Sequence, residues 1–144
     1  MIEVKFKLLT PTAKAPSQSD PDDSGWDLYV SEDVDVWDTP TLIKTGVAVE
    51  LPPGWEIQVR PRSSAAMKRN LHVVFGTVDN GYRGEIGLIA WLQLPHTAQA
   101  PLRLKIGDRV GQVCVCPTYR VRWTQADELS GSARGTNAYG SSGK

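Results

Sequence analysis

The sequence predicts an all-β protein whose strands fold into a jelly-roll-like β-barrel or sandwich. Short runs that are apolar, or that alternate apolar and polar residues, recur through most of the chain, which is typical of strands. Clusters of Gly, Pro, Asn, Asp and Ser separate these runs at short intervals, as in barrels and sandwiches. The 144 residues suit one domain with a modest core, and they show no internal repeat and no coiled-coil heptad.

Turn clusters such as PDDSG, DTP, PPG and DNGYRG bound the expected strands. One short helix is expected at 63–69, SSAAMKR, with Ser63 or Ser64 as its N-cap. The strand-like runs are, in chain order, VKFKLL (4–9), TLIKTGVAVEL (41–51), WEIQVRP (55–61), HVVFGTVD (72–79), EIGLIAWLQL (85–94), LRLKIGDRVGQVCVCP (102–117) and YRVRWT (119–124).

A change in composition divides the chain into a β domain at 1–123 and a linker with a C-terminal arm at 124–144. The linker, QADELSGSA, is polar, and the arm, RGTNAYGSSGK, is rich in Gly and hydroxyl residues. Composition alone favours a flexible terminus. The same residues, with one Arg and one Tyr, are also those of a loop that wraps around phosphate groups.

Composition excludes several classes of protein. Hydrophobic residues make up 40% and charged residues 22%, as in a soluble globular protein, and no apolar run approaches the about 20 residues that span a bilayer. Sixteen Lys and Arg balance sixteen Asp and Glu, which disfavours a nucleic-acid partner. The N-terminus lacks a signal-peptide pattern, so we expect a cytoplasmic protein with no membrane partner. We interpret Cys114 and Cys116 as buried apolar side chains in a reducing compartment.

The neutral net charge conceals a local asymmetry that suits an anion site. Residues 20–38 hold acids but no Lys or Arg, whereas basic residues outnumber acids between 60 and 122. Arg62 and Ser63 precede the expected helix, where a guanidinium, a hydroxyl and backbone N–H groups can bind phosphate. The alternative is a solvated basic stretch with a helix cap.

Two carboxylates stand at positions suited to catalysis. Asp79 ends an apolar run just before the turn Asn80-Gly81, where it could act as a general base on water or cap a hairpin. Asp27 starts a strand, where it could hold the waters of a Mg²⁺ ion or lie on an acidic surface. Gln112 could donate to phosphate, whereas we expect Asp108 and Arg109 to form a structural ion pair with each other.

Five segments in one order resemble the five motifs of the trimeric deoxyuridine triphosphatases, the dUTPases. They are DSGWDL, PRSSAA, GTVDNGYRGE, GDRVGQ and RGTNAYGSSG, and with TGVAVELPPGW the resemblance covers about 23–143. It implies a jelly-roll-like subunit in a homotrimer, with the C-terminal arm closing over a neighbour's site. It also implies Mg²⁺-dependent hydrolysis of dUTP to dUMP and pyrophosphate, which limits uracil in DNA and supplies dUMP for thymidylate synthesis.

The resemblance also implies roles for individual residues. Asp79 would deprotonate the water that attacks the α-phosphorus, and Asp27 would hold a water of the Mg²⁺ shell. Tyr82 would pack on the deoxyribose and exclude a 2′-hydroxyl, while backbone groups of 73–82 would read the uracil. Arg134 would bind the γ-phosphate and Tyr139 would stack on uracil. The remaining implied substrate-binding residues are Arg62, Ser63, Ser64, Gly76, Val78, Gln112, Gly140, Ser141 and Ser142.

The sequence departs from the family pattern at a few positions. Ser64-Ala65 replaces Gly-Leu in the second motif, Val73 stands where an Asn often reads the base, and Asn137-Ala138 replaces Gly-Gly in the arm. Two other functions are alternatives for a chain of this pattern. A dCTP deaminase would need a Glu where this chain has Ile89, and a nucleotide-binding regulatory module would not need Asp79 and Arg134.

Overall fold

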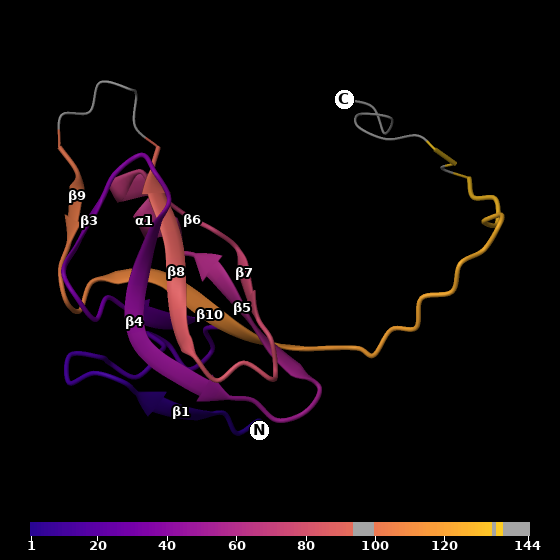
Figure 1. Ribbon diagram of the computed structural model, residues 1–144, viewed down its shortest axis with the longest axis horizontal. Helices are drawn as coiled ribbons and strands as arrows, with labels where there is room; N and C mark the ends of the chain where they lie inside the picture. The colour runs from indigo at the N-terminus through magenta and orange to yellow at the C-terminus, as the bar shows by residue number, and fades with distance from the viewer. Residues whose placement is uncertain (94–99, 134, 137–144) are drawn as a thin grey trace.

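Two four-stranded antiparallel sheets form the body of the computed structural model, which describes residues 1–93, 100–133 and 135–136 (Figure 1). The first sheet has the order β1-β4-β8-β6, the second β2-β10-β5-β7, and a two-stranded ribbon pairs β3 with β9. The strands are β1 Lys5–Leu8, β2 Trp26–Tyr29, β3 Val34–Val36, β4 Thr41–Glu50, β5 Trp55–Pro61, β6 Leu71–Val73, β7 Gly76–Val78, β8 Glu85–Leu92, β9 Leu102–Leu104 and β10 Arg109–Pro117.

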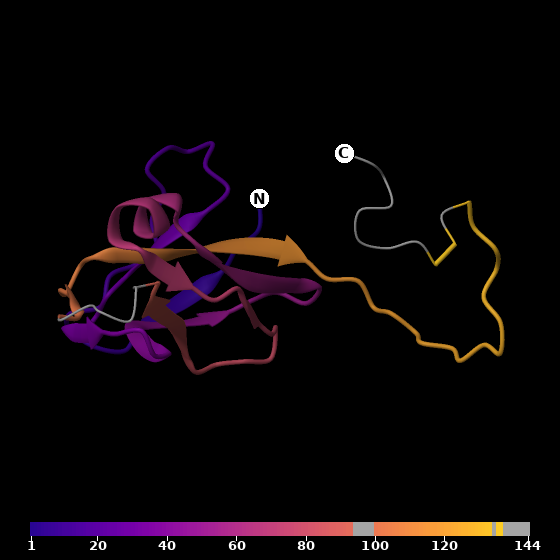
Figure 2. The ribbon, with the colours of Figure 1, turned by 90° about the horizontal axis from the view of Figure 1, so that it is seen from above.

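The sheets pack face to face as two layers, with the orange β10 in one and the purple β4 in the other (Figure 2). Alternation along the strands places apolar side chains between the layers. In β8, for example, Ile86, Leu88 and Ala90 are buried, whereas Ile89 between them is exposed. The buried cluster takes side chains from both sheets, so the predicted all-β class is confirmed and takes its sandwich form.

The predicted helix is confirmed as α1, Ser63–Arg69, but the expected cap is wrong. Arg62 is the N-cap residue and makes no side-chain capping bond, and both serines belong to the helix itself. At the other end Asn70 adopts a left-handed conformation (φ 50°), which Asn tolerates, and its N–H donates to the Ala66 carbonyl.

The structure divides two of the expected strands. The run 72–79 bends between β6 and β7, and the two halves pair in different sheets. The run 102–117 turns between β9 and β10, where Gly107 takes a left-handed φ of 88° that favours glycine. Gly107-Asp108-Arg109 is itself a turn signal in the sequence, whereas the bend between β6 and β7 was missed because apolar residues continue through it. Two short strands lay outside the runs, namely β2, where Asp27 was expected to start a strand, and β3.

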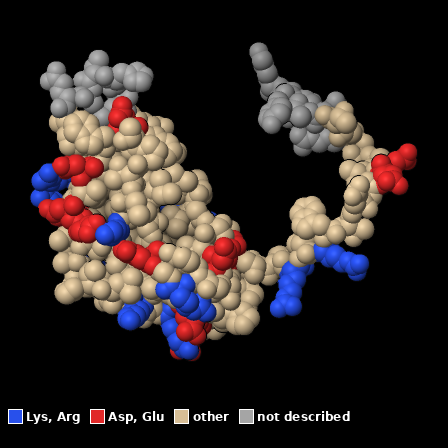
Figure 3. Space-filling model, in the orientation of Figure 1, with Lys and Arg blue, Asp and Glu red and all other residues tan. Residues whose placement is uncertain are grey.

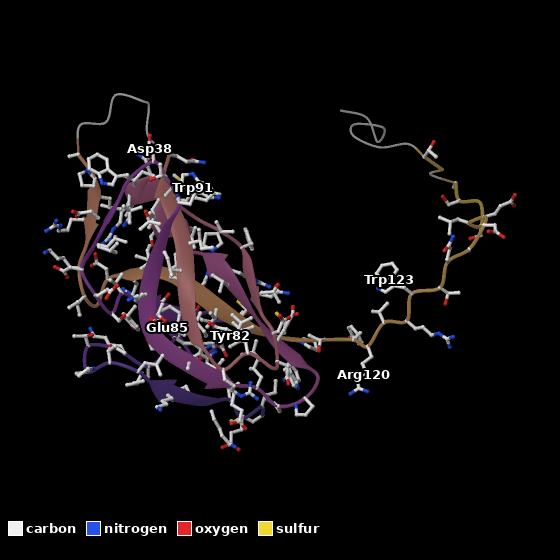
Figure 4. All side chains as sticks on the ribbon, viewed as in Figure 1. Asp38, Tyr82, Glu85, Trp91, Arg120 and Trp123 are labelled. Carbon is white, nitrogen blue, oxygen red and sulfur yellow. The ribbon has the colours of Figure 1, made fainter. Side chains whose placement is uncertain are left out.

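The run YRVRWT was expected to be a strand, but it is not one in this structure, in which the last strand ends at Pro117. After Pro117 the chain leaves the sheets and runs away from them (Figures 1 and 4). Tyr119, Val121 and Trp123 are 86%, 67% and 93% exposed. The alternation that predicted a strand is therefore present without a partner among the described residues.

No helix in the described ranges is both long and apolar enough to cross a membrane.

Ion pairs connect the strands of the β3–β9 ribbon, where positive and negative side chains lie together at one edge of the domain (Figure 3). Arg103 binds Asp35 through two hydrogen bonds of 2.6 and 2.5 Å, and Lys105 Nζ lies 2.7 Å from Asp33. The bond from Lys105 and one from the Ile106 N–H hold the pKa of Asp33 below its ordinary value. The bond from Arg103 lowers the pKa of Asp35 in the same way.

These lowered pKa values predict a loss of stability in acid. A carboxylate whose pKa is lowered in the folded state stabilises the fold at pH values above its ordinary pKa of 3.8. This stabilisation disappears as the pH falls through the folded-state pKa. Urea unfolding at about pH 5 and about pH 3 should show a larger loss of unfolding free energy in the wild type than in the double variant Asp33→Asn, Asp35→Asn. Equal losses in both proteins would contradict the role of the ribbon.

Candidate active site

A polar cavity of about 360 Å³ opens on the outer face of the second sheet, beside the start of α1. Its volume suits a small ligand, and charged, hydroxyl and amide side chains dominate its surface. It is lined by Ser19, Asp23, Ser24, Gly25, Asp27, Arg60, Arg62, Ser63, Ser64, Gln112 and Cys114. The structure thus brings together five of the predicted site residues, namely Asp27, Arg62, Ser63, Ser64 and Gln112.

Strand register explains why residues far apart in the sequence meet here. β10 lies between β2 and β5, and Gln112 pairs with Asp27 on one side and with Arg60 on the other. Residues directly opposite in a sheet point to the same face, so these three side chains form a row across the outer surface. Cys114 follows Gln112 on the same face, and its side chain forms part of the cavity wall.

Asp27 is buried and lies between two arginines. One carboxylate oxygen is 2.7 Å from Arg62 Nε, and the other is 3.1 Å from an Nη atom of Arg109. Charge-assisted bonds of this kind fix the geometry of both partners. The expected pair between Asp108 and Arg109 is wrong, because Asp108 binds Arg69 at 3.1 Å instead. Arg109 is therefore a residue of the site that sequence reasoning assigned elsewhere.

The side chain of Gln112 is fixed by two contacts. Its Nε2 donates to the Pro61 carbonyl at 3.0 Å, just before the start of α1. Its Oε1 lies over Gly25, where an added Cβ would stand only 2.0 Å away, so a larger residue would displace the amide. Gly25 is thus a second residue that sequence reasoning missed, and its place directly before Trp26 and Asp27 was the available signal.

The turn after β7 carries the second group of predicted residues. Asp79 is exposed, and its carbonyl accepts the Tyr82 N–H at 3.0 Å. The Tyr82 hydroxyl donates to the Glu85 carbonyl at 3.0 Å, and Figure 4 shows the two residues near each other. These bonds fix the backbone of the turn that carries Asp79, while the Asp79 side chain stays open to solvent.

Asn80 fixes this turn to the neighbouring loop. Its Nδ2 lies 3.2, 2.7 and 3.3 Å from the backbone carbonyls of Leu51, Pro52 and Trp55. The pattern Asn-Gly predicted a turn, but only the structure shows that the amide connects the turn after β7 to the loop before β5 and to the first residue of that strand.

Asp79 lies near the start of β5, whereas most of the polar cavity lies toward the end of that strand. Val78 pairs with Ile57 near the start of β5, and Arg62 follows its end, five positions further and about 16 Å along a strand. The cavity wall reaches back as far as Cys114, which lies opposite Gln58. Gly76, Val78, Asp79 and Tyr82 are not among the residues that line the cavity.

The predicted arm residues Arg134, Tyr139, Gly140, Ser141 and Ser142 lie outside the described residues. Among the residues that are described, no three His, Cys, Asp or Glu side chains form a metal cluster. The cavity does contain the carboxylates of Asp23 and Asp27. Oxygen donors of this kind suit Mg²⁺, which commonly binds through one or two carboxylates, waters and ligand phosphates.

Comparison with known proteins places this architecture in one family. The family model for dUTPase matches residues 12–143. The chain is 37% identical to deoxyuridine 5′-triphosphate nucleotidohydrolase from Crocosphaera subtropica, over 99% of both chains, and 40% identical to the Picosynechococcus protein of the same name, again over 99% of both. The dUTPase of Staphylococcus bacteriophage 80alpha, solved as a G164S mutant with dUpNHpp, superposes with a TM-score of 0.90 at 26% identity over 99% of both chains. The chain belongs to the dUTPase family.

Proposed function

We propose that this chain hydrolyses dUTP to dUMP and pyrophosphate. Its relatives carry the name of that activity, and the 80alpha enzyme binds dUpNHpp. The observation that carries the proposal is the polar cavity, in which Arg62, Ser63, Ser64 and Gln112 converge around Asp27. Several donors and a guanidinium at one cavity suit a chain of phosphates.

Arg62 and Gln112 owe their position to the surrounding strands. Asp27 binds Arg62 through Nε, and Nη2 makes no hydrogen bond to the described residues, so that edge of the guanidinium can face a phosphate. Gln112 donates one amide hydrogen to Pro61, and the second remains available for a phosphate oxygen. Ser63 and Ser64 add hydroxyl donors at the first turn of α1. Groups fixed in this way bind phosphate without reorganisation.

Asp79 is proposed to be the general base. Its carboxylate takes a proton from a water molecule whose oxygen bonds to the α-phosphorus, while the bond from that phosphorus to the bridging oxygen breaks. The products are dUMP and pyrophosphate. The turn supports this role because Asp79 is exposed on a backbone held by the Tyr82 N–H and by Asn80. A base must be both positioned and accessible to water.

The segment of β7 and the following turn, which carries Asp79, is proposed to read the nucleoside. Among the described residues β7 is an edge strand whose one partner is β5, so backbone groups of Gly76 and Val78 on its other edge can pair with a uracil ring. A fixed pattern of donors and acceptors rejects cytosine because the wrong exocyclic group leaves polar atoms unpaired. Tyr82, held by the Glu85 carbonyl, is placed to pack on the deoxyribose.

The separation of Asp79 from the polar cavity supports a site assembled from several subunits, in a homotrimer. The exposed Tyr119, Val121 and Trp123 need an apolar surface, and their chain already runs away from its own sheets. The domain offers a second, apolar cavity of about 420 Å³, lined by Ile2, Val4, Phe6, Pro16, Trp26, Val49, Ile57, Ile86, Val113 and Val115. We propose that such contacts support exchange of the arm, 124–144, so that Arg134, Tyr139, Gly140, Ser141 and Ser142 close over a neighbour's nucleotide.

Mg²⁺ is the proposed cofactor, with Asp27 as the residue that orients one of its waters. Bound to the triphosphate, the ion would neutralise phosphate charge. The carboxylates of Asp23 and Asp27 in the cavity support this assignment. In a cytoplasmic setting the reaction would limit uracil incorporation into DNA and supply dUMP for thymidylate synthesis.

Replacement of Asp79 by Asn tests the general base. The variant should lose about two to four orders of magnitude in turnover, because the amide cannot accept the proton of water. Calorimetric titration with dUpNHpp should show affinity close to that of the wild type, since the charge removed is not a phosphate ligand. Turnover within tenfold of the wild type would contradict this role.

Mixing two inactive variants tests assembly of the site between subunits. Asp79→Asn and Arg62→Gln chains, unfolded and refolded together, should regain turnover at about one site in four, because mixed cyclic trimers then pair an intact Asp79 with an intact Arg62 from different chains. Each variant refolded alone is the control. A site contained in one chain would give no recovery.

A nucleotide panel tests the substrate. Pyrophosphate release from dUTP should exceed release from dCTP and UTP by at least about a hundredfold, because unpaired polar groups and a steric clash oppose the other two nucleotides. The same assay in excess chelator should lose most of its rate. Comparable turnover of dCTP would refute the assignment of uracil, and an undiminished rate in chelator would refute the assignment of Mg²⁺.

A further inference from the structure

We infer that Arg60, which lies outside the five motifs, is a further phosphate-binding residue of the polar cavity, and that Gln58 and Glu56 are its positioning residues. The inference deepens the proposed function and rests on it for the identity of the substrate. Arg60 lines the cavity together with Arg62. It lies two residues before Arg62, near the end of β5. It stands directly opposite Gln112, so both side chains project from the same face of the sheet.

A ladder of polar side chains along β5 fixes the Arg60 guanidinium. Gln58 Nε2 donates to Glu56 Oε1 at 2.8 Å, which orients the amide so that its oxygen faces Arg60. Arg60 Nη2 then donates to Gln58 Oε1 at 2.8 Å and contacts Cys116 Sγ at 3.9 Å. A long side chain held by such contacts loses less conformational freedom when it binds a ligand.

Charge distinguishes Arg60 from the other arginines at the cavity. Arg62 and Arg109 both bind the Asp27 carboxylate, which offsets part of their charge. Within the described residues Arg60 forms no ion pair, and its partners are a neutral amide and a thiol. Arg60 is half-buried in the cavity wall, and no carboxylate pairs with it among the described residues. A cation in such a position favours an anionic ligand.

The hydrogen-bond pattern also leaves donors for that ligand. Arg60 uses Nη2 for both of its contacts, and neither Nε nor Nη1 bonds to any described residue. The guanidinium carries five N–H donors in one plane, so a phosphate can be bound by those that the ladder does not use. The phosphate chain of the nucleotide is the ligand that this chemistry fits.

Binding of inorganic tripolyphosphate tests the inference without the nucleoside, and therefore separately from the proposed function. Calorimetry should show that Arg60→Gln weakens binding by about ten- to hundredfold, the range of a charge-assisted bond, while Arg60→Lys recovers part of the loss. Arg103→Gln, which removes an arginine from the distant β3–β9 ribbon, is the matched control and should bind as the wild type does. Gln58→Leu, which keeps Arg60 but removes its support, should give an intermediate loss.

Kinetics on dUTP then separates binding from support of the fold. Arg60→Gln should raise KM by at least about tenfold without a matching fall in the melting temperature, since the direct partners of Arg60 are a neutral amide and a thiol. Wild-type binding of tripolyphosphate by Arg60→Gln overturns the inference. So does a loss of binding that Arg60→Lys does not relieve at all. If the wild-type protein binds tripolyphosphate through Arg60 but does not hydrolyse dUTP, the proposed function fails and the anion site stands.

Discussion

The buried carboxylate of Asp27 is the group on which the organisation of the polar cavity depends. It binds Arg62 and Arg109, residues that follow β5 and begin β10, and so connects three strands at one point. A buried carboxylate is stable only when it is paired, and two guanidiniums meet that requirement. Removal of Asp27 would leave two neighbouring cations, Arg62 in the cavity wall and Arg109 beside it, without their shared partner. Asp27 therefore determines where positive charge is available for a ligand.

In the second sheet, side chains alternate between a face that packs in the core and a face that carries polar residues of the site. Its inner face contributes Ile57 and Val113 to the core, while the outer face of the same strands carries Arg60 and Gln112. The edge strand β7 presents Asp79 at the far end. Core side chains and cavity side chains thus alternate along each strand, so the core packing beneath the cavity holds its side chains in place.

Much of this architecture could be predicted from the sequence, because it follows from local pattern. Alternation predicted most strands, and the grouping of Asp27, Arg62, Ser63, Ser64 and Gln112 agrees with the resemblance to dUTPases. Contacts between distant residues could not be predicted in this way. Arg109 binds a carboxylate 82 positions earlier, and the role of Gly25 depends on where Gln112 lies. Cys116, expected to be buried, is half-exposed beside Arg60 because it lies on the outer face. The alternation of 119–123 predicted a strand, but alternation does not specify where the partner strand lies.

The contacts of Asn80 make the turn between β7 and β8 sensitive to chemical ageing. Asn-Gly sequences are prone to deamidation, in which the side-chain amide becomes a carboxylate. At position 80 that change would replace the donor shared by three carbonyl oxygens, those of Leu51, Pro52 and Trp55, with an acceptor that repels them. The turn beside Asp79 would then lose its connection to the preceding loop, although no residue of the polar cavity had changed. The connection of this turn to the preceding loop accordingly depends on a single amide group.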